Sequence, residues 1–176
     1  REFKRVVAAI RLTLPYTGMI LSTRESAEFR DEVISLGISQ ISAGSRTNPG
    51  GYKEAVENDE HSEQFTIYDT RSLDEVMRSL CDMGLMPSMC TACYRLGRTG
   101  EAFMEEAKSG HIHTYCLPNA ILTFREFLED YASDETKRAG LKIISEQMKE
   151  VEDPRILKSL ISKLEEIEQG KRDVFF

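Results

Sequence analysis

The sequence predicts an α/β fold in which the first half alternates strands with helices and the second half is helical. Apolar residues recur at helical spacing in segments 2–14 and 26–36, and short apolar runs at 17–22 and 38–43 indicate strands between and after them. Strands and helices that alternate with short connections are typical of a parallel sheet or barrel. The chain has 176 residues, of which 40% are hydrophobic, so it can bury an ordinary globular core.

The elements of the first half have identifiable ends. Pro15 stops the first helix, because proline lacks the N–H group that a helix interior needs. Ser26 opens the second helix, and Gly37 follows its last turn. Two strands cannot close an eight-stranded barrel, which takes ~250 residues. We therefore expect residues 1–84 to be the closing edge of such a barrel, and the chain to be the C-terminal part of a longer protein.

The second half is expected to form helices only. Their predicted ranges are 100–108, 119–131, 133–150 and 153–168, and a helix over 73–83 is expected at the end of the first half. The last helix has Asp153 as its N-cap, Pro154 at its first position and Gly170 just beyond its end. Loops are expected over the polar stretch 53–64 and over 109–116. We predict two domains, 1–84 and 85–176, and expect the apolar residues 174–176 to dock against the body of the protein.

Charge and hydropathy exclude several classes of function. The formal net charge is −7, and basic residues form no patch of the kind that binds nucleic acid. The apolar runs are far shorter than the ~20 residues that cross a bilayer, and no apolar secretory segment opens the sequence. We therefore predict a cytoplasmic protein that binds neither nucleic acid nor a membrane.

The cysteines form one cluster in the middle of the chain, which favours metal ligation in a reducing compartment over a disulfide framework. Two residues separate Cys90 from Cys93, and Cys116 follows after 22 more, so three thiolates can converge on one centre. Thiolates suit both zinc and iron–sulfur clusters. The spacing alone leaves both metals open.

The two kinds of metal site differ in the number of protein ligands that they need. Zinc in a structural site needs a fourth protein ligand, which Cys81, His111 or His113 can supply, whereas a cubane on three cysteines leaves one iron open. Cys81 lies on an apolar helical pattern and is expected to be a buried, inert thiol. The two histidines are expected to be exposed or to donate hydrogen bonds to cluster sulfurs rather than to bind metal.

Hydroxyl and guanidinium groups follow both predicted strands. Ser22 and Arg24 come at the end of the first strand, and Ser45 and Arg46 follow the second. In α/β barrels the ligand site lies at the carboxyl ends of the strands, so these side chains can bind a carboxylate or a phosphate. The arginines can equally have a structural role by pairing with neighbouring acidic side chains.

Several short stretches resemble a known enzyme family. Residues 21–26 (LSTRES), 29–31, 42–43, 49–52 and 64–65 are similar to the end of the radical S-adenosylmethionine (SAM) barrel in tyrosine lyases of the thiamine-synthesis type. That resemblance covers roughly residues 1–84. Thiamine lyases end soon afterwards, whereas this sequence continues with a C-x2-C-x22-C motif. Over essentially its whole length the chain resembles the radical SAM tyrosine lyases that mature the [FeFe]-hydrogenase.

This resemblance implies a carbon–carbon lyase that makes carbon monoxide and cyanide from tyrosine and assembles an Fe–CO–CN unit for the hydrogenase active site. Cys90, Cys93 and Cys116 match the family's ligands to an auxiliary [4Fe-4S] cluster with one open iron. In the family a free cysteine bridges that iron to an extra, labile iron, which enters as Fe(II). Hydrogenase maturation proteins are the implied partners.

The resemblance also implies which parts of the enzyme this chain contains and which it lacks. Ser22, Arg24, Ser45 and Arg46 fall on the substrate side of the family's barrel, where the carboxylate of tyrosine is their expected partner. The radical SAM motif C-x3-C-x2-C is absent, so SAM and a second [4Fe-4S] cluster are expected only in a missing N-terminal part. We expect no catalytic residue here, no activity from this stretch alone, and an anaerobic bacterial source. The alternative is a zinc-stabilised structural or binding module without redox chemistry.

Overall fold

The computed structural model describes residues 1–47, 65–110 and 112–176, with the side chains of Ile112 and His113 also outside the description. The chain divides into two compact units, Arg1–Val76 and Met77–Phe176, and each is described by itself. Helix α3 (Leu73–Asp82) includes the division between them. No helix among the described residues is long and apolar enough to cross a bilayer.

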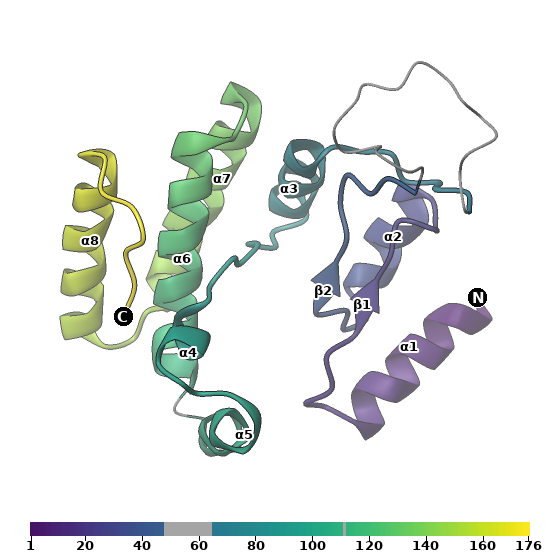
Figure 1. The fold of residues 1–176 in the computed structure, drawn as a ribbon, viewed down its shortest axis with the longest axis horizontal. Helices are drawn as coiled ribbons and strands as arrows, with labels where there is room; N and C mark the ends of the chain where they lie inside the picture. The colour runs from purple at the N-terminus through teal and green to yellow at the C-terminus, as the bar shows by residue number, and fades with distance from the viewer. Residues whose placement is uncertain (48–64, 111) are drawn as a thin grey trace. The chain divides into compact units, whose positions relative to one another are not determined.

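Unit 1 contains the predicted alternation of helices and strands. Its elements are α1 (Glu2–Thr13), β1 (Ile20–Leu21), α2 (Ala27–Ile34) and β2 (Gln40–Ile41), as Figure 1 shows. The two strands pair in parallel, with Ile20 opposite Gln40 and Leu21 opposite Ile41. The alternation is therefore confirmed, although the described residues are mostly helical and form only this two-stranded sheet.

Local signals explain the ends of the unit 1 helices. The side-chain oxygen of Ser26 accepts a hydrogen bond from the N–H of Phe29 at 3.3 Å, which caps α2. Arg11 of α1 donates from Nε and Nη2 to the carbonyl of Gly37 at 2.9 and 2.7 Å. Gly37 has a φ of +110°, and a Cβ there would lie 2.6 Å from Cγ of Arg11. Only glycine fits this contact between α1 and the end of α2.

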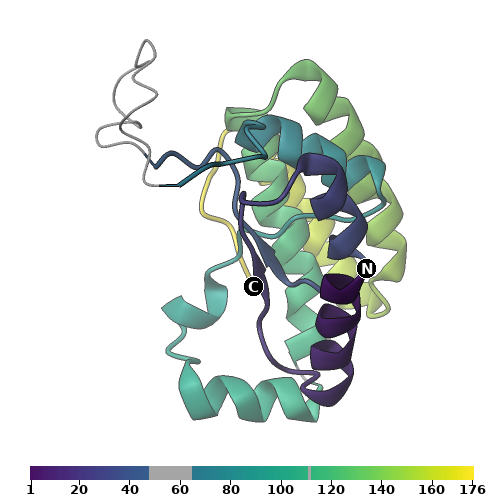
Figure 2. The same cartoon turned by 90° about the vertical axis from the view of Figure 1, so that its right-hand side faces the viewer.

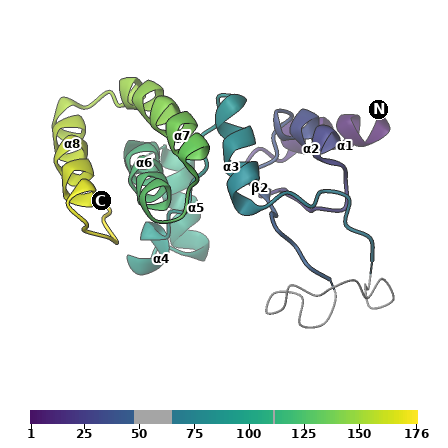
Figure 3. The ribbon, with the colours of Figure 1, turned by 90° about the horizontal axis from the view of Figure 1, so that it is seen from above.

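Unit 2 is built around the long helix α6 (Ile112–Asp130). This helix packs against α7 (Asp134–Gln147) and α8 (Pro154–Glu168), which Figure 3 shows on either side of it. The core comes mainly from its apolar face, whose fully buried members include Ile121, Leu122, Phe124 and Leu128. The short helix α4 (Ala92–Arg95) and α5 (Gly100–Ser109) precede α6, and α5 runs crosswise to it (Figure 2).

Three predictions about the helices of unit 2 were wrong in their bounds. The helix expected from residue 119 begins at Ile112, although Pro118 lies inside it and cannot donate to the carbonyl of Thr114. Pro118 is fully buried, so its packing offsets the missing hydrogen bond. The segment 112–116 is thus helix rather than loop, and α4 was not predicted. The helix expected over 133–150 ends at Gln147 and continues as the 3-10 turn Met148–Glu150.

The segment Asp173–Phe176 docks on unit 2, as predicted. Val174 is buried, and its N–H donates to Oε1 of Glu126 at 2.9 Å. The N–H of Phe176 donates to Oδ1 of Asn119 at 2.8 Å. Figure 1 shows the segment running back between α8 and α6.

Candidate functional site

Three cysteine thiols line one cavity in unit 2. Cys90 lies just before α4, Cys93 lies within α4, and Cys116 lies in the second turn of α6. The cavity that they line with Arg98 and Asn119 has a volume of about 320 Å³. The same three thiols and Arg98 also line a neighbouring, mostly apolar cavity of about 820 Å³. Two segments separated in sequence therefore bring the three predicted ligands to one place.

The backbone fixes the positions of Cys90 and Cys93. The N–H of Ala92 donates to Sγ of Cys90 at 3.4 Å. Ala92 is 2% exposed, which fixes α4 against the rest of the unit. After α4 the chain turns at Gly97, whose φ is +69°, and the N–H of Arg98 donates to the carbonyl of Cys93 at 2.8 Å. This turn brings the Arg98 side chain back to the cavity.

The electrostatics of the thiols fit a bound cationic group. Burial raises the pKa of the Cys116 thiol, the negative charges of Cys93 and Cys90 raise it further, and the Arg98 guanidinium partly opposes both effects. Three neighbouring thiolates repel one another, and a bound iron–sulfur core or metal ion relieves that repulsion. The donor set, three soft sulfurs on a shared cavity, is one that iron–sulfur clusters use. Among the described residues, no group of three or more histidine, cysteine or acidic side chains is placed so that it could hold a metal ion.

Three further residues, Cys81, His111 and His113, were candidates for a fourth metal ligand. Cys81 is buried in α3, as predicted, and lines neither cavity. Burial, with a smaller contribution from Asp82, raises the pKa of Cys81 to about 11, so its thiol stays protonated and inert. His111 and the side chain of His113 lie outside the described residues, as do residues 49–52 and 64, part of the stretches that resemble the enzyme family.

The four candidate substrate-binding residues follow two strands, β1 and β2, that are parallel neighbours. Ser22 and Arg24 follow β1, and Ser45 and Arg46 follow β2, at the same edge of the sheet. Arg24 is exposed, and its guanidinium lies 4.0 Å from the centre of the Phe65 ring. Ser22 Oγ accepts a long hydrogen bond from the N–H of Arg24 at 3.5 Å. Ser22 and Arg46 are also exposed, and Ser45 is half-buried.

Sequence reasoning missed a buried ionic cluster beside this edge. Arg30 and Asp69 form an ion pair in which each side chain is 1% exposed, and Arg30 also donates to the carbonyl of Ser42. Arg71 donates to Asp69 and, at 3.0 Å, to Asp31. Burial raises the pKa of Asp69, but hydrogen bonds from Arg71 and the charge of Arg30 outweigh it, so the pKa lies below its ordinary value. The cluster fixes the loops that follow both strands.

Arg98 was also missed. Its Nε is buried and has no hydrogen-bond partner among the described residues. The available signal was its position five residues after Cys93, in the turn Gly97–Gly100 that is otherwise small and uncharged.

The first half of the chain is similar to a known protein family. The Biotin and Thiamin Synthesis associated domain matches residues 1–86. The 2-iminoacetate synthase of Escherichia coli (strain K12) is 42% identical over 87 residues, and that of Salmonella typhimurium (strain LT2) is 42% identical over 89 residues. Each match covers 49% of this chain and 22% of the synthase.

Similarity to solved structures extends through the helical unit as well. A crystal structure of HydG, a maturase of the [FeFe]-hydrogenase, is 53% identical with a TM-score of 0.90 and covers 99% of this chain and 37% of that one. The HydG maturase of Carboxydothermus hydrogenoformans is 37% identical with a TM-score of 0.66, covering 92% of this chain and 33% of that one. This chain thus resembles the C-terminal portion of HydG, which confirms the family predicted from the sequence. It spans about a third of the HydG chains that it matches.

Proposed function

We propose that this chain is the auxiliary-cluster portion of a radical SAM tyrosine lyase that makes carbon monoxide and cyanide and assembles an Fe–CO–CN unit for the [FeFe]-hydrogenase. Cys90, Cys93 and Cys116 hold a [4Fe-4S] cluster, and tyrosine and SAM are the substrates of the whole enzyme. The cluster, when bound, supplies an open iron through which free cysteine attaches the iron to be loaded. Hydrogenase maturation proteins receive the product, in the cytoplasm of an anaerobic bacterium.

One observation carries this proposal. Three thiols from two separate segments line one cavity, in a chain that is 53% identical to a HydG over 99% of its length. The curated 2-iminoacetate synthases match only 49% of the chain, so they account for about half of it. The remaining half is long enough to hold an additional function, and the cavity with its three thiols supports one that uses a metal cluster.

The residues of this chain have separate tasks in the proposal. The three cysteines hold the cluster, and apolar side chains such as Leu85 and Phe103 line the larger cavity beside it. At the edge of unit 1, Arg24 and Arg46 bind the carboxylate of tyrosine, with hydroxyl donors from Ser22 and Ser45. The residues that cleave SAM belong to the rest of the enzyme, so this chain alone is expected to leave tyrosine intact.

The test is the iron and sulfide content of the anaerobically reconstituted chain, together with its electron paramagnetic resonance spectrum after reduction. We expect about four irons and four sulfides per chain, the content of a [4Fe-4S] cluster, and a signal that shifts when free cysteine or cyanide is added. Cys93→Ala should lose the cluster. Cys81→Ala is the matched control, because this thiol is buried elsewhere, and it should keep the full content.

The competing result is one zinc per chain with no sulfide and no paramagnetic signal. In that case His111→Ala or His113→Ala should weaken metal binding, since zinc needs a fourth protein ligand. That outcome would replace the proposal with a structural zinc module.

A further inference from the structure

Arg98 is a cation at the three-cysteine cavity whose hydrogen-bonding capacity is not fully used. Its side chain lines both cavities that contain the three thiols. Its Nε is buried from solvent and has no hydrogen-bond partner among residues 1–47, 65–110 and 112–176. A buried guanidinium N–H without an acceptor costs free energy and calls for an explanation. Nε of Arg30 is also buried without a partner, but only Arg98 lines the cavities that contain the thiols.

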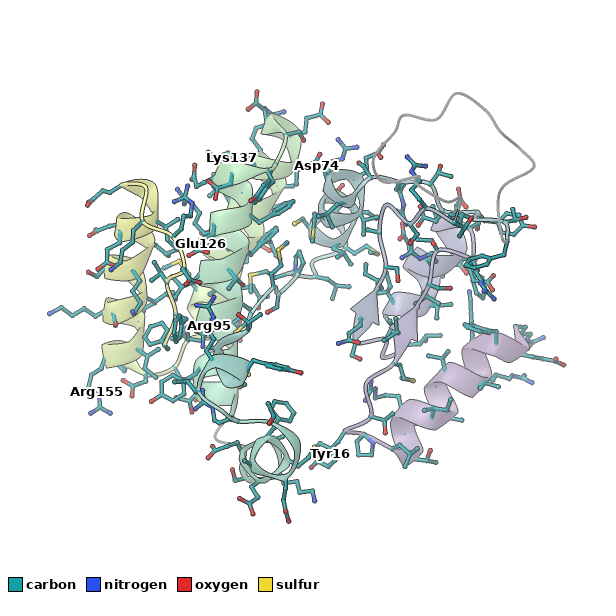
Figure 4. All side chains as sticks on the ribbon, viewed as in Figure 1. Tyr16, Asp74, Arg95, Glu126, Lys137 and Arg155 are labelled. Atoms are coloured by element: carbon teal, nitrogen blue, oxygen red, sulfur yellow. The ribbon has the colours of Figure 1, made fainter. Side chains whose placement is uncertain are left out.

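Arg95, which lies three residues earlier, has its interactions satisfied elsewhere. Its guanidinium forms an ion pair with Asp173 at 2.6 Å and lies 5.2 Å from the centre of the Phe175 ring. Figure 4 shows Arg95 on α4, and it lines neither of the two cavities. Arg95 is thus exposed and paired with Asp173, whereas Arg98 is half-buried and lines both cavities that contain the thiols.

The backbone fixes Arg98 at the cavity. The N–H of Arg98 donates to the carbonyl of Cys93 at 2.8 Å, so the residue is tied to one of the three thiol-bearing positions. Arg98 is half-buried, and the apolar residues of the larger cavity surround the same space. A half-buried charge is less screened by solvent than a fully exposed one, which strengthens its interaction with a nearby sulfur.

We propose that Arg98 is a positioning residue for the auxiliary cluster, donating its Nε–H to a sulfur of the group that the three cysteines hold. This inference rests on the proposed function. A cubane with three thiolates has a negative net charge, and one-electron reduction makes it more negative. A cation and an N–H donor at its sulfurs stabilise the reduced state, because net charge and hydrogen bonds to sulfur set the potential of such clusters. Arg98 therefore raises the reduction potential of the cluster.

The experiment is a redox titration of the anaerobically reconstituted chain, followed by electron paramagnetic resonance. Arg98→Leu removes both the charge and the N–H donors, whereas Arg98→Gln removes the charge and keeps an N–H donor. We expect the midpoint potential to shift to more negative values in Arg98→Leu, with a smaller shift in Arg98→Gln. Arg95→Gln is the matched control, because it removes an equal charge from the same segment, and it should shift the potential least.

The outcomes separate this inference from the proposed function. If the wild-type chain takes up zinc without sulfide, the proposed function fails. If the wild-type cluster forms but Arg98→Leu shifts its potential no more than Arg95→Gln, only the role of Arg98 is overturned. An Arg98→Leu chain with native circular dichroism that binds no iron supports the inference. If that variant does not fold, the potential of Arg98→Gln against that of Arg95→Gln decides.

Discussion

The ion pair between Arg30 and Asp69 is the interaction of unit 1 whose loss should destabilise it most. Each side chain is 1% exposed, and Arg30 also binds the carbonyl of Ser42 after β2. Asp69→Asn preserves the shape of the side chain but removes its charge. The Arg30 guanidinium is then left buried without a counter-ion.

The structure sets the magnitude of this effect. Removing one partner of a buried ion pair costs about 3–5 kcal/mol, whereas a whole domain is stable by only about 5–15 kcal/mol. The matched control is Asp31→Asn, which breaks a pair with Arg71 in which the side chains are 29% and 20% exposed. Partly solvated pairs of that kind contribute about 1 kcal/mol or less.

The assay is urea unfolding at pH 7, followed by far-UV circular dichroism, for the wild type and both variants. Asp69→Asn should lower the free energy of unfolding by several times as much as Asp31→Asn. Replacing the pair together, as Arg30→Met with Asp69→Leu, should cost less than Asp69→Asn alone, because no buried charge remains. Equal losses in Asp69→Asn and Asp31→Asn would refute the reasoning, since they would mean that the Arg30 charge is not desolvated.

Three further predictions concern stability. Because hydrogen bonds from Arg71 hold the pKa of Asp69 below its ordinary value of 3.8, that carboxylate stabilises the fold at neutral pH, and the urea midpoint should fall as pH drops through about 4 and below. The fall should be smaller in Asp69→Asn, which keeps other carboxyl groups of lowered pKa such as Glu129 and Asp130. Gly140→Ala should lower the free energy of unfolding by about 1–3 kcal/mol, because a Cβ at this position would lie 2.6 Å from both Cδ atoms of Leu128. This cost exceeds the gain from the higher helix propensity of alanine. A higher melting temperature of the variant would contradict the prediction. Val174→Ala should cost about 1.5 kcal/mol, and in the wild type the Val174 amide should exchange slowly by mass spectrometry; exchange as fast as in a free peptide would disprove its docking.

The order of elements in unit 1 could be predicted because the signals that end its helices act locally. Pro15, Ser26 and Gly37 each operate within one turn of their own position. Strand length could not be predicted in the same way, because strand bounds depend on the partner strand. Only Ile20–Leu21 and Gln40–Ile41 pair among the described residues, whereas the sequence patterns that suggested strands were several residues longer.

The start of α6 shows how tertiary packing overrides a local signal. Pro118 favours a helix that begins near it, but the proline is fully buried and the helix begins at Ile112. This error placed Cys116 on a loop, when it lies on a helix. The convergence of Cys90, Cys93 and Cys116 did not depend on that detail, because two short segments bring them together whichever backbone carries Cys116.

The buried charges could not be found from the sequence, because their partners are far apart along it. Arg30 and Asp69 are separated by 39 positions, and neither lies in a pattern that predicts burial. A charged residue is rarely buried without a partner, so a sequence gives no reason to place one inside. Arg98 is a different case. Its proposed role is to donate a hydrogen bond from Nε, and the described residues contain no acceptor for that N–H.

The segment Asp173–Phe176 connects the packing of unit 2 to the geometry of the thiols. Its residues contact both cysteine-bearing helices: Asp173 pairs with Arg95 of α4, and the N–H of Phe176 donates to Asn119 of α6, 57 positions away. Asn119 itself lines the three-thiol cavity. A short helix such as α4 is not stable on its own, so tertiary contacts must fix it. The segment Asp173–Phe176 lies outside the cavity and helps to set the distance between Cys93 and Cys116. Arg98 lines the cavity itself and, in our proposal, contacts the group that the cysteines hold.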